Sequence, residues 1–171
     1  MHVLRYIFPV VTAFIVYKVS WFTLTDFEGN SIDLTLNGAT DGGELWVPEN
    51  FGDIGGFPFG YVIVAVLAIG LFVMGRNHGD EEDANFTLAG TGVVTLVLTV
   101  VTLFMKNTII GASPEEMQID GYPAMDFSLA PAFWIVLVLS IAMIAAGIIA
   151  LVMQYSAEQE DADREPETEA A

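Results

Sequence analysis

The residues that could hold a metal ion lie together in one short polar stretch. His78 is followed by four consecutive acids, Asp80, Glu81, Glu82 and Asp83. An imidazole with several carboxylates can ligate a divalent cation. Unspaced acidic runs in loops, however, are typical of solvated surface. We therefore expect this stretch to face water and predict no metal site.

Other groups that do chemistry are scarce. The chain has no cysteine, which removes thiolate nucleophiles, disulfides and cysteine-based metal sites. The other histidine, His2, is at the N-terminus. Haem ligation between helices would need facing His or Met side chains, and no predicted span contains a histidine. Asn85-Phe86-Thr87 matches a glycosylation sequon at the edge of an apolar segment, which we interpret as chance. The sequence predicts no catalytic residue and no cofactor, so we do not expect an enzyme.

Two stripes of small residues recur at helical spacing and predict faces for helix packing. Threonine hydroxyls at this spacing bond to carbonyls of their own helix or to a neighbouring helix, and small side chains let a second helix approach closely. The threonines are also open to a second interpretation, the polar lining of a path for a solute. The two faces are Thr91, Thr95, Thr99 and Thr102 in one segment and Ala142, Ala146 and Ala150 in another.

These residues belong to a chain in which charge and apolar sequence are separated. Of its 171 residues, 54% are hydrophobic, against roughly 45–50% in soluble domains. All 22 acids fall outside four long apolar segments. A carboxylate near the bilayer centre costs about 2.5–3.5 kcal/mol, so hydrocarbon demands this separation. The sequence predicts an α-helical, multi-pass membrane protein with a bundle of four transmembrane helices.

The predicted organisation is four spans, two long outer loops and one short inner loop. The last three spans hold 19, 20 and 23 uncharged residues, enough to cross about 30 Å of hydrocarbon. The acidic tail cannot bury enough apolar surface to order itself, and we expect it to be disordered. The predicted spans are 3–24, 57–75, 86–105 and 131–153; the loops are 25–56, 76–85 and 106–130; the tail is 154–171.

The first span is the weakest, because Arg5 and Lys18 leave 12 uncharged residues between them. A cleaved secretory signal is the alternative, but the bulky residues 19–22 do not suit a cleavage site. We predict a retained helix with Lys18 reaching the interface. The positive-inside rule favours cytoplasmic termini in the cell membrane. Three basic residues lie on the side of the termini and two on the other, namely Arg5, Arg76 and Arg164 against Lys18 and Lys106.

The long loops predict a small extracellular antiparallel β-sheet. Residues 31–36 alternate polar and apolar after a turn-forming stretch at 28–30, which is typical of a hairpin. A lone hairpin is marginal in water, so we expect 44–47 to add a strand and 117–120 of the second loop to join. The apolar face of the hairpin would hold Ile32, Leu34 and Leu36.

The order of these elements carries a resemblance. Trp21 lies near the end of the first span, and the first outer loop contains Gly43-Glu44-Leu45-Trp46. With four spans, inner termini and a sheet-forming first loop, the chain resembles the claudin and peripheral myelin protein superfamily, although the pair of cysteines that continues the family's pattern is absent. The resemblance implies a claudin-like tetraspan fold. Our candidates for an interaction surface are Trp21, Leu45, Trp46 and Phe51.

The net charge of -17 limits the partners. Such a charge repels itself, and salt relieves the repulsion because the Debye length falls to about 3 Å at 1 M. This acidic, lysine-poor composition resembles proteins of extremely halophilic archaea, so we expect a high-salt habitat. Nucleic acid and anionic lipid headgroups need basic patches that the chain lacks.

The function hypothesis is a non-enzymatic structural or protein-interaction component of a cell envelope or membrane complex. Its partners would be the lipid bilayer, further copies of the chain or other membrane proteins. One alternative is a channel or transport accessory subunit whose threonines line a path, and another is a membrane protein of a virus of halophiles. A coupled transporter is not expected, because no span contains Asp, Glu or His.

Overall fold

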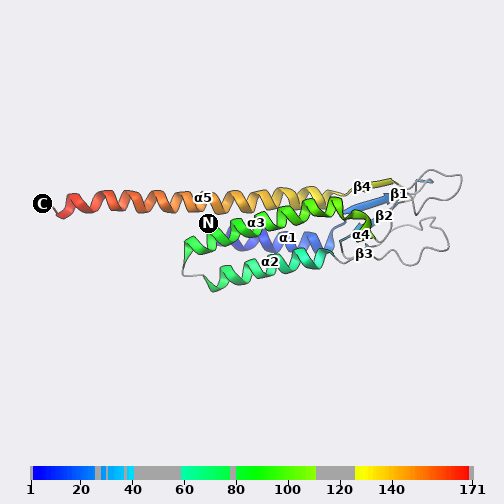
Figure 1. Cartoon of the computed structure of the whole chain (residues 1–171), viewed down its shortest axis with the longest axis horizontal. Helices are drawn as coiled ribbons and strands as arrows, with labels where there is room; N and C mark the ends of the chain where they lie inside the picture. The colour runs from blue at the N-terminus through cyan, green and yellow to red at the C-terminus, as the bar shows by residue number, and fades with distance from the viewer. Residues whose placement is uncertain are drawn as a thin grey trace.

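The computed structural model is a helical bundle with a small sheet at one end (Figure 1). It describes residues 2–25, 28–29, 31–36, 38–40, 59–77, 80–110 and 126–169. We call the end with the sheet the sheet end and the end with the connection 77–80 the turn end. The helices are α1 (His2–Lys18), α2 (Phe59–Arg76), α3 (Glu81–Phe104), the short α4 (Lys106–Ile110) and α5 (Pro131–Glu169).

Three helices are long and apolar enough to cross a membrane. They are α2, α3 and the part of α5 from Pro131 to Gln159. Their outward faces carry large apolar side chains, among them Phe72, Phe86 and Val138, which are more than half exposed. Such a surface suits hydrocarbon rather than water. Helix α1, with 17 residues, is shorter than these three.

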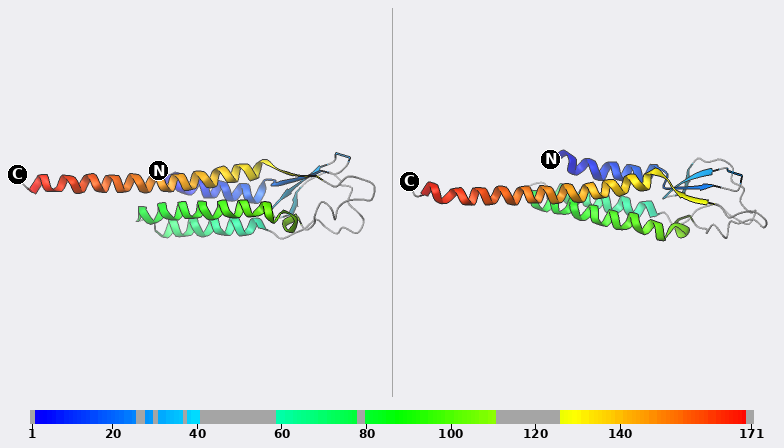
Figure 2. Two further views of the ribbon diagram at one scale, coloured as in Figure 1. Left: turned by 45° about the horizontal axis from the view of Figure 1, so that its top comes forward. Right: turned by 90° about the horizontal axis from the view of Figure 1, so that it is seen from above.

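The four long helices pack side by side with alternating direction. Contacts join α1 to α2, α2 to α3, α3 to α5 and α5 to α1, so each helix has two antiparallel neighbours (Figure 2). The N-terminus and the connection 77–80 both lie at the turn end. This is the up-down-up-down arrangement that short connections favour.

Two glycines bring α3 and α5 into backbone contact. A Cβ atom on Gly147 would lie 2.7 Å from the carbonyl oxygen of Asn85, and one on Gly92 would lie 2.9 Å from that of Ser140. The buried stripe of α5 therefore runs through Ser140, Met143 and Gly147. The predicted small face, Ala142, Ala146 and Ala150, lies beside this stripe and is half-buried.

The sheet has four antiparallel strands in the order β3-β2-β1-β4. They are β1 (Phe22–Thr25), β2 (Ser31–Thr35), β3 (Gly38–Thr40) and β4 (Asp126–Leu129). Phe22 pairs with Leu34 in β2 and with Leu129 in β4. Gly29, with φ of 89°, supplies the left-handed conformation of the turn between β1 and β2. The prediction of a small antiparallel sheet built from both long loops is thus confirmed.

The sheet is fixed to the bundle through the segment that joins α1 to β1. The backbone N–H of Trp21 donates to the carbonyl of Leu34, and its own carbonyl accepts from Ala130 at the start of α5. The Trp21 ring meets Phe133 of α5 edge to face at 6.1 Å. Alternate residues of β1 are buried, so one face of the sheet closes the core.

Several predicted boundaries differ from the structure. The predicted span 3–24 ends as helix at Lys18, because residues 22–25 pair with β2 as a strand. The third helix starts at Glu81 rather than 86, because Asp80 caps it by accepting from the backbone N–H of Asp83. The three acids of this first turn also suit the positive end of the helix dipole. The predicted inner loop 76–85 is correspondingly shorter.

The prediction of a disordered tail over 154–171 is wrong for residues 154–169, which continue α5 as helix. In Figure 2 this extension runs past the other helices in both views. Residues 154–165 contain neither glycine nor proline and consist largely of helix formers, so the span propagates outward without a stop. The high charge of the tail prevents it from forming a packed core, but it does not prevent a single helix that is surrounded by solvent.

The outer strands also differ from the prediction. The third strand is Gly38–Thr40, and the second loop contributes Asp126–Leu129. The strands predicted at 44–47 and 117–120 lie outside the described residues.

The α3–α5 contact predicts opposite effects of alanine at two glycines. Gly147→Ala forces the helices apart and lowers the free energy of unfolding by about 1–3 kcal/mol. Gly75→Ala, the control, meets nothing within 4 Å and leaves stability unchanged or raises it by less than about 1 kcal/mol. Thermal unfolding in detergent measures both. Equal stability of the two variants would contradict the close contact.

Candidate functional site

A cluster of polar side chains gathers at the turn end, and we call it the turn-end cluster. It consists of Arg5, Glu81, Glu82, Asn85, Gln154 and Tyr155. The guanidinium of Arg5 lies 3.6 Å from the Glu81 carboxylate. Arg5 is only 8% exposed, whereas Glu81 is at the surface. A buried cation of this kind needs a carboxylate partner, so this contact binds α1 to α3.

The cluster also joins α3 to α5. The phenol of Tyr155 donates to Glu82 at 2.6 Å, across 73 residues of sequence. At the adjoining turn, the Asn77 amide donates to Asp83 at 3.4 Å. The acids that open α3 therefore contact α1, α5 and the turn after α2, and they hold the helices together at this end.

Three atoms of the cluster are buried without a hydrogen-bond partner in the protein. They are Arg5 Nε, Asn85 Oδ1 and Gln154 Oε1. Asn85 is 1% exposed. They are one donor and two acceptors, and all three belong to residues at the turn end of the bundle.

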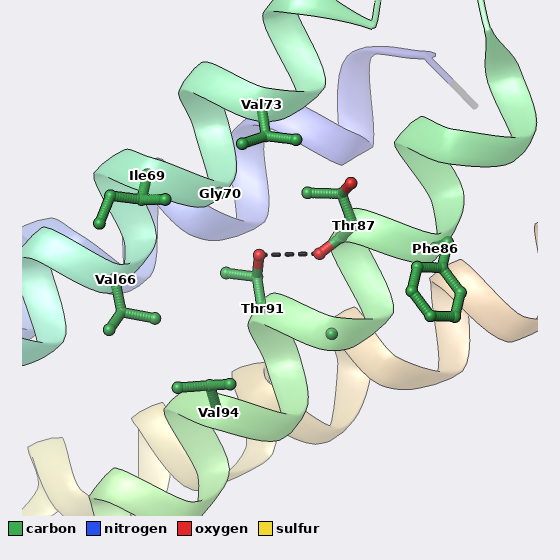
Figure 3. Close-up of a pocket in the computed structure, with 9 residues that line it drawn as sticks. Val66, Ile69, Gly70, Val73, Phe86, Thr87, Thr91 and Val94 are labelled. Atoms are coloured by element: carbon green, nitrogen blue, oxygen red, sulfur yellow. Dashed lines mark hydrogen bonds between the residues drawn. The ribbon is translucent and has the colours of Figure 1, made fainter.

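The threonine stripe lies inside the bundle. Thr95, Thr99 and Thr102 are fully buried and Thr91 nearly so. Thr91 donates to the carbonyl of Thr87 at 2.8 Å, as Figure 3 shows, and Thr99 donates to that of Thr95 at 2.8 Å. Thr91 also lies directly against Gly70 of α2. Thr95 Oγ1 is the exception, because it has no partner in the protein.

Of the residues predicted to form an interaction surface, the structure describes only Trp21. Trp21 is fully buried, so its placement on such a surface is wrong. The reason is its position where α1, the sheet and α5 meet, which makes it a core residue. Leu45, Trp46 and Phe51 lie outside the described residues.

His78 also lies outside the described residues. Within the described part of the chain, no group of three or more His, Asp or Glu side chains is close enough to hold a metal ion.

The turn-end cluster was missed by sequence reasoning, which treated its charges as solvated loop. A signal was available, because four alternating spans put the start of the first, the start of the third and the end of the fourth at the same face. That topology places Arg5 near Glu81 and near the end of the fourth span. The burial of Arg5 depends on side-chain packing, which spacing does not reveal.

No protein-family model matches the chain, and a search among curated proteins gives no match. The chain's function therefore has to be argued from its own residues.

Because the amide oxygen of Asn85 is unpaired, we predict that an apolar substitution at this position increases stability. Asn85→Leu removes an unsatisfied buried acceptor and raises the free energy of unfolding by about 1 kcal/mol. Asn85→Asp buries a charge next to the acids of α3 and lowers it by about 3 kcal/mol or more. Unfolding in detergent gives both values. A loss of stability in the leucine variant would show that the amide oxygen is engaged.

Proposed function

We propose that the chain is a four-span, non-enzymatic membrane protein that acts as a structural or protein-interaction component of a cell envelope or membrane complex. The observation that carries this proposal is the attachment of the sheet. Strands β1 and β4 continue directly into α1 and α5, and the backbone of Trp21 bonds to both sides. A sheet held in this way is a rigid platform on which a partner can be bound.

The outer face of the platform is polar. Ser31, Asp33 and Ser128 are exposed, and Thr23 donates to Asp33 across the β1–β2 pair at 2.9 Å. The opposite face is closed against the core by Phe22 and Leu24. An exposed polar face on a fixed support suits recognition by another protein more than it suits chemistry.

Helix α1 is the fourth span in this proposal. Its 17 residues reach about 25 Å, slightly less than the roughly 30 Å of hydrocarbon. It packs against α2 and α5, and the charge of Arg5 is paired with Glu81. A short helix that is shielded on two sides can span with local thinning of the bilayer.

The proposed orientation is supported by the arrangement of the ends. The N-terminus and the C-terminal extension of α5 both lie at the turn end, opposite the sheet (Figure 1). Arg5 and Arg76 lie at this end too, while Lys18 and Lys106 lie towards the sheet. We place the turn end in the cytoplasm of a cell and the sheet outside, as the positive-inside rule favours.

The claudin-like resemblance gives the proposal its specific form, which is self-association or association with other membrane proteins through the outer loops. The alternative, a channel or transport accessory subunit, has weaker support. The hydroxyls of Thr12, Thr99 and Ser140 donate to carbonyls of their own helices. Among the buried hydroxyls of the described residues, Thr95 alone has no hydrogen-bond partner that could keep it from a path through the bundle.

Photocrosslinking in native membranes tests the proposal. A photoreactive residue at Ser31 or Ser128, both exposed on the sheet, should give an adduct with a second copy or another membrane protein. The matched control is Ser156, which is exposed on the α5 extension at the other end. The proposal fails if neither sheet position gives an adduct, or if Ser156 gives the same adducts.

A further inference from the structure

A groove lies between α2 and α3 on the outside of the bundle (Figure 3). Its volume is about 410 Å³, within the range of roughly 300–1,000 Å³ that holds small molecules. Gly70 and Thr91, both buried, form its floor, and the exposed Ile69, Phe86 and Val94 line it further out. Because these outer residues are exposed, the groove opens to the surroundings of the bundle.

The groove lies in the half of the bundle next to the turn end. Phe86 and Val94 follow the last acid of the first turn, Asp83, by about 5 and 17 Å along the helix. Both lining helices are long and apolar enough to span a membrane. In a bilayer that these two helices span, as the proposed function has it, the groove faces the hydrocarbon of a single leaflet.

The lining suits hydrocarbon. Its two hydroxyls are already engaged, because Thr91 donates to the carbonyl of Thr87 at 2.8 Å and Thr87 donates to that of Asp83 at 2.7 Å. The other lining residues are glycine, valine, isoleucine and phenylalanine. No lining side chain needs a polar group from a ligand.

Gly90 keeps this groove open. Glycine inside a helix is destabilising relative to alanine, so its presence calls for a reason. For Gly92 and Gly147 the reason is the close packing of α3 against α5, which leaves no room for a side chain. Gly90 has no such reason, because nothing lies within 4 Å of the position that its Cβ atom would take. Gly90 lines the groove, so a side chain there would fill it.

Arg76 ends α2 beyond the groove, on the side of the turn end. Arg76 follows the lining residue Val73 by three positions, which places both on one side of α2. Arg76 is exposed, and among the described residues it has no ion-pair partner. Its guanidinium is thus available to a phosphate at the membrane surface.

We propose that this groove binds one hydrocarbon chain of a zwitterionic phospholipid whose phosphate pairs with Arg76. The turn end disfavours a headgroup of net negative charge, because four exposed acids, residues 80–83, lie at the same end of the bundle as Arg76. The same acids attract the amine of a zwitterionic headgroup. Anionic lipid remains disfavoured, as the net charge of -17 leads us to expect.

Native mass spectrometry tests the proposal on the full chain. The protein is transferred to detergent containing equal amounts of phosphatidylcholine and phosphatidylglycerol with identical chains. We expect the unaltered chain to retain one phosphatidylcholine. Gly90→Leu should lower this retention about tenfold, whereas Gly75→Leu, at an equally open glycine outside the groove, should not. Arg76→Gln should lower it about fivefold, and Arg76→Lys should preserve most of it.

Three results would overturn the proposal. Equal retention in Gly90→Leu and Gly75→Leu would mean that the groove is not the site. Preferential retention of phosphatidylglycerol would contradict the assigned headgroup. If the unaltered chain is an oligomer and the Gly90→Leu variant is a monomer that retains the same amount of lipid, the groove binds a helix of a second copy instead.

Discussion

Hydrocarbon cannot hydrogen-bond, and this constraint explains most of the structure. Hydroxyls inside the bundle turn back on their own helices, as Thr99 and Ser140 do. Charged side chains gather at the two ends, where Arg5 finds Glu81 and Lys106 lies 5.9 Å from the ring centre of Phe127. Without a hydrophobic force between helices in lipid, close backbone contact has to supply the attraction. The glycines of α3 and α5 provide it.

The two ends of the bundle are stabilised in different ways. At the sheet end, backbone hydrogen bonds and the Trp21–Phe133 ring contact continue the helices into strands. At the turn end, charged and polar side chains hold the helices and leave Arg5 Nε, Asn85 Oδ1 and Gln154 Oε1 unpaired, whereas Trp21 Nε1 is the unpaired buried atom of the described residues at the sheet end. In the proposed function, the first end is the one that presents a surface to a partner. The second is polar, adjoins the α2–α3 groove, and is suited to contact with lipid headgroups and water.

The sequence predicted what depends on periodicity and on the cost of burying charge. These rules predicted the last three spans, the helix start at Pro131, the turn at Gly29 and an apolar hairpin face with Leu34. It missed what depends on neighbours distant in sequence. Trp21 resembles an interfacial residue until β2 and α5 close around it, and Gly147 gains its role only from the approach of α3. The composition of the tail predicted disorder. Residues 154–169 instead continue α5, because extending a helix that a span has already formed costs little free energy.

The central claim is that the chain crosses the membrane four times, with both termini on one side and the sheet on the other. Labelling of single introduced cysteines tests this claim most directly, because the chain has no cysteine of its own. Three variants, each with one cysteine in place of His2, Ser31 or Glu158, are treated with a membrane-impermeant maleimide in intact cells or oriented vesicles. We predict that His2→Cys and Glu158→Cys react from the same side of the membrane and Ser31→Cys from the other. Labelling of His2→Cys from the same side as Ser31→Cys would show that α1 does not cross and would contradict the account.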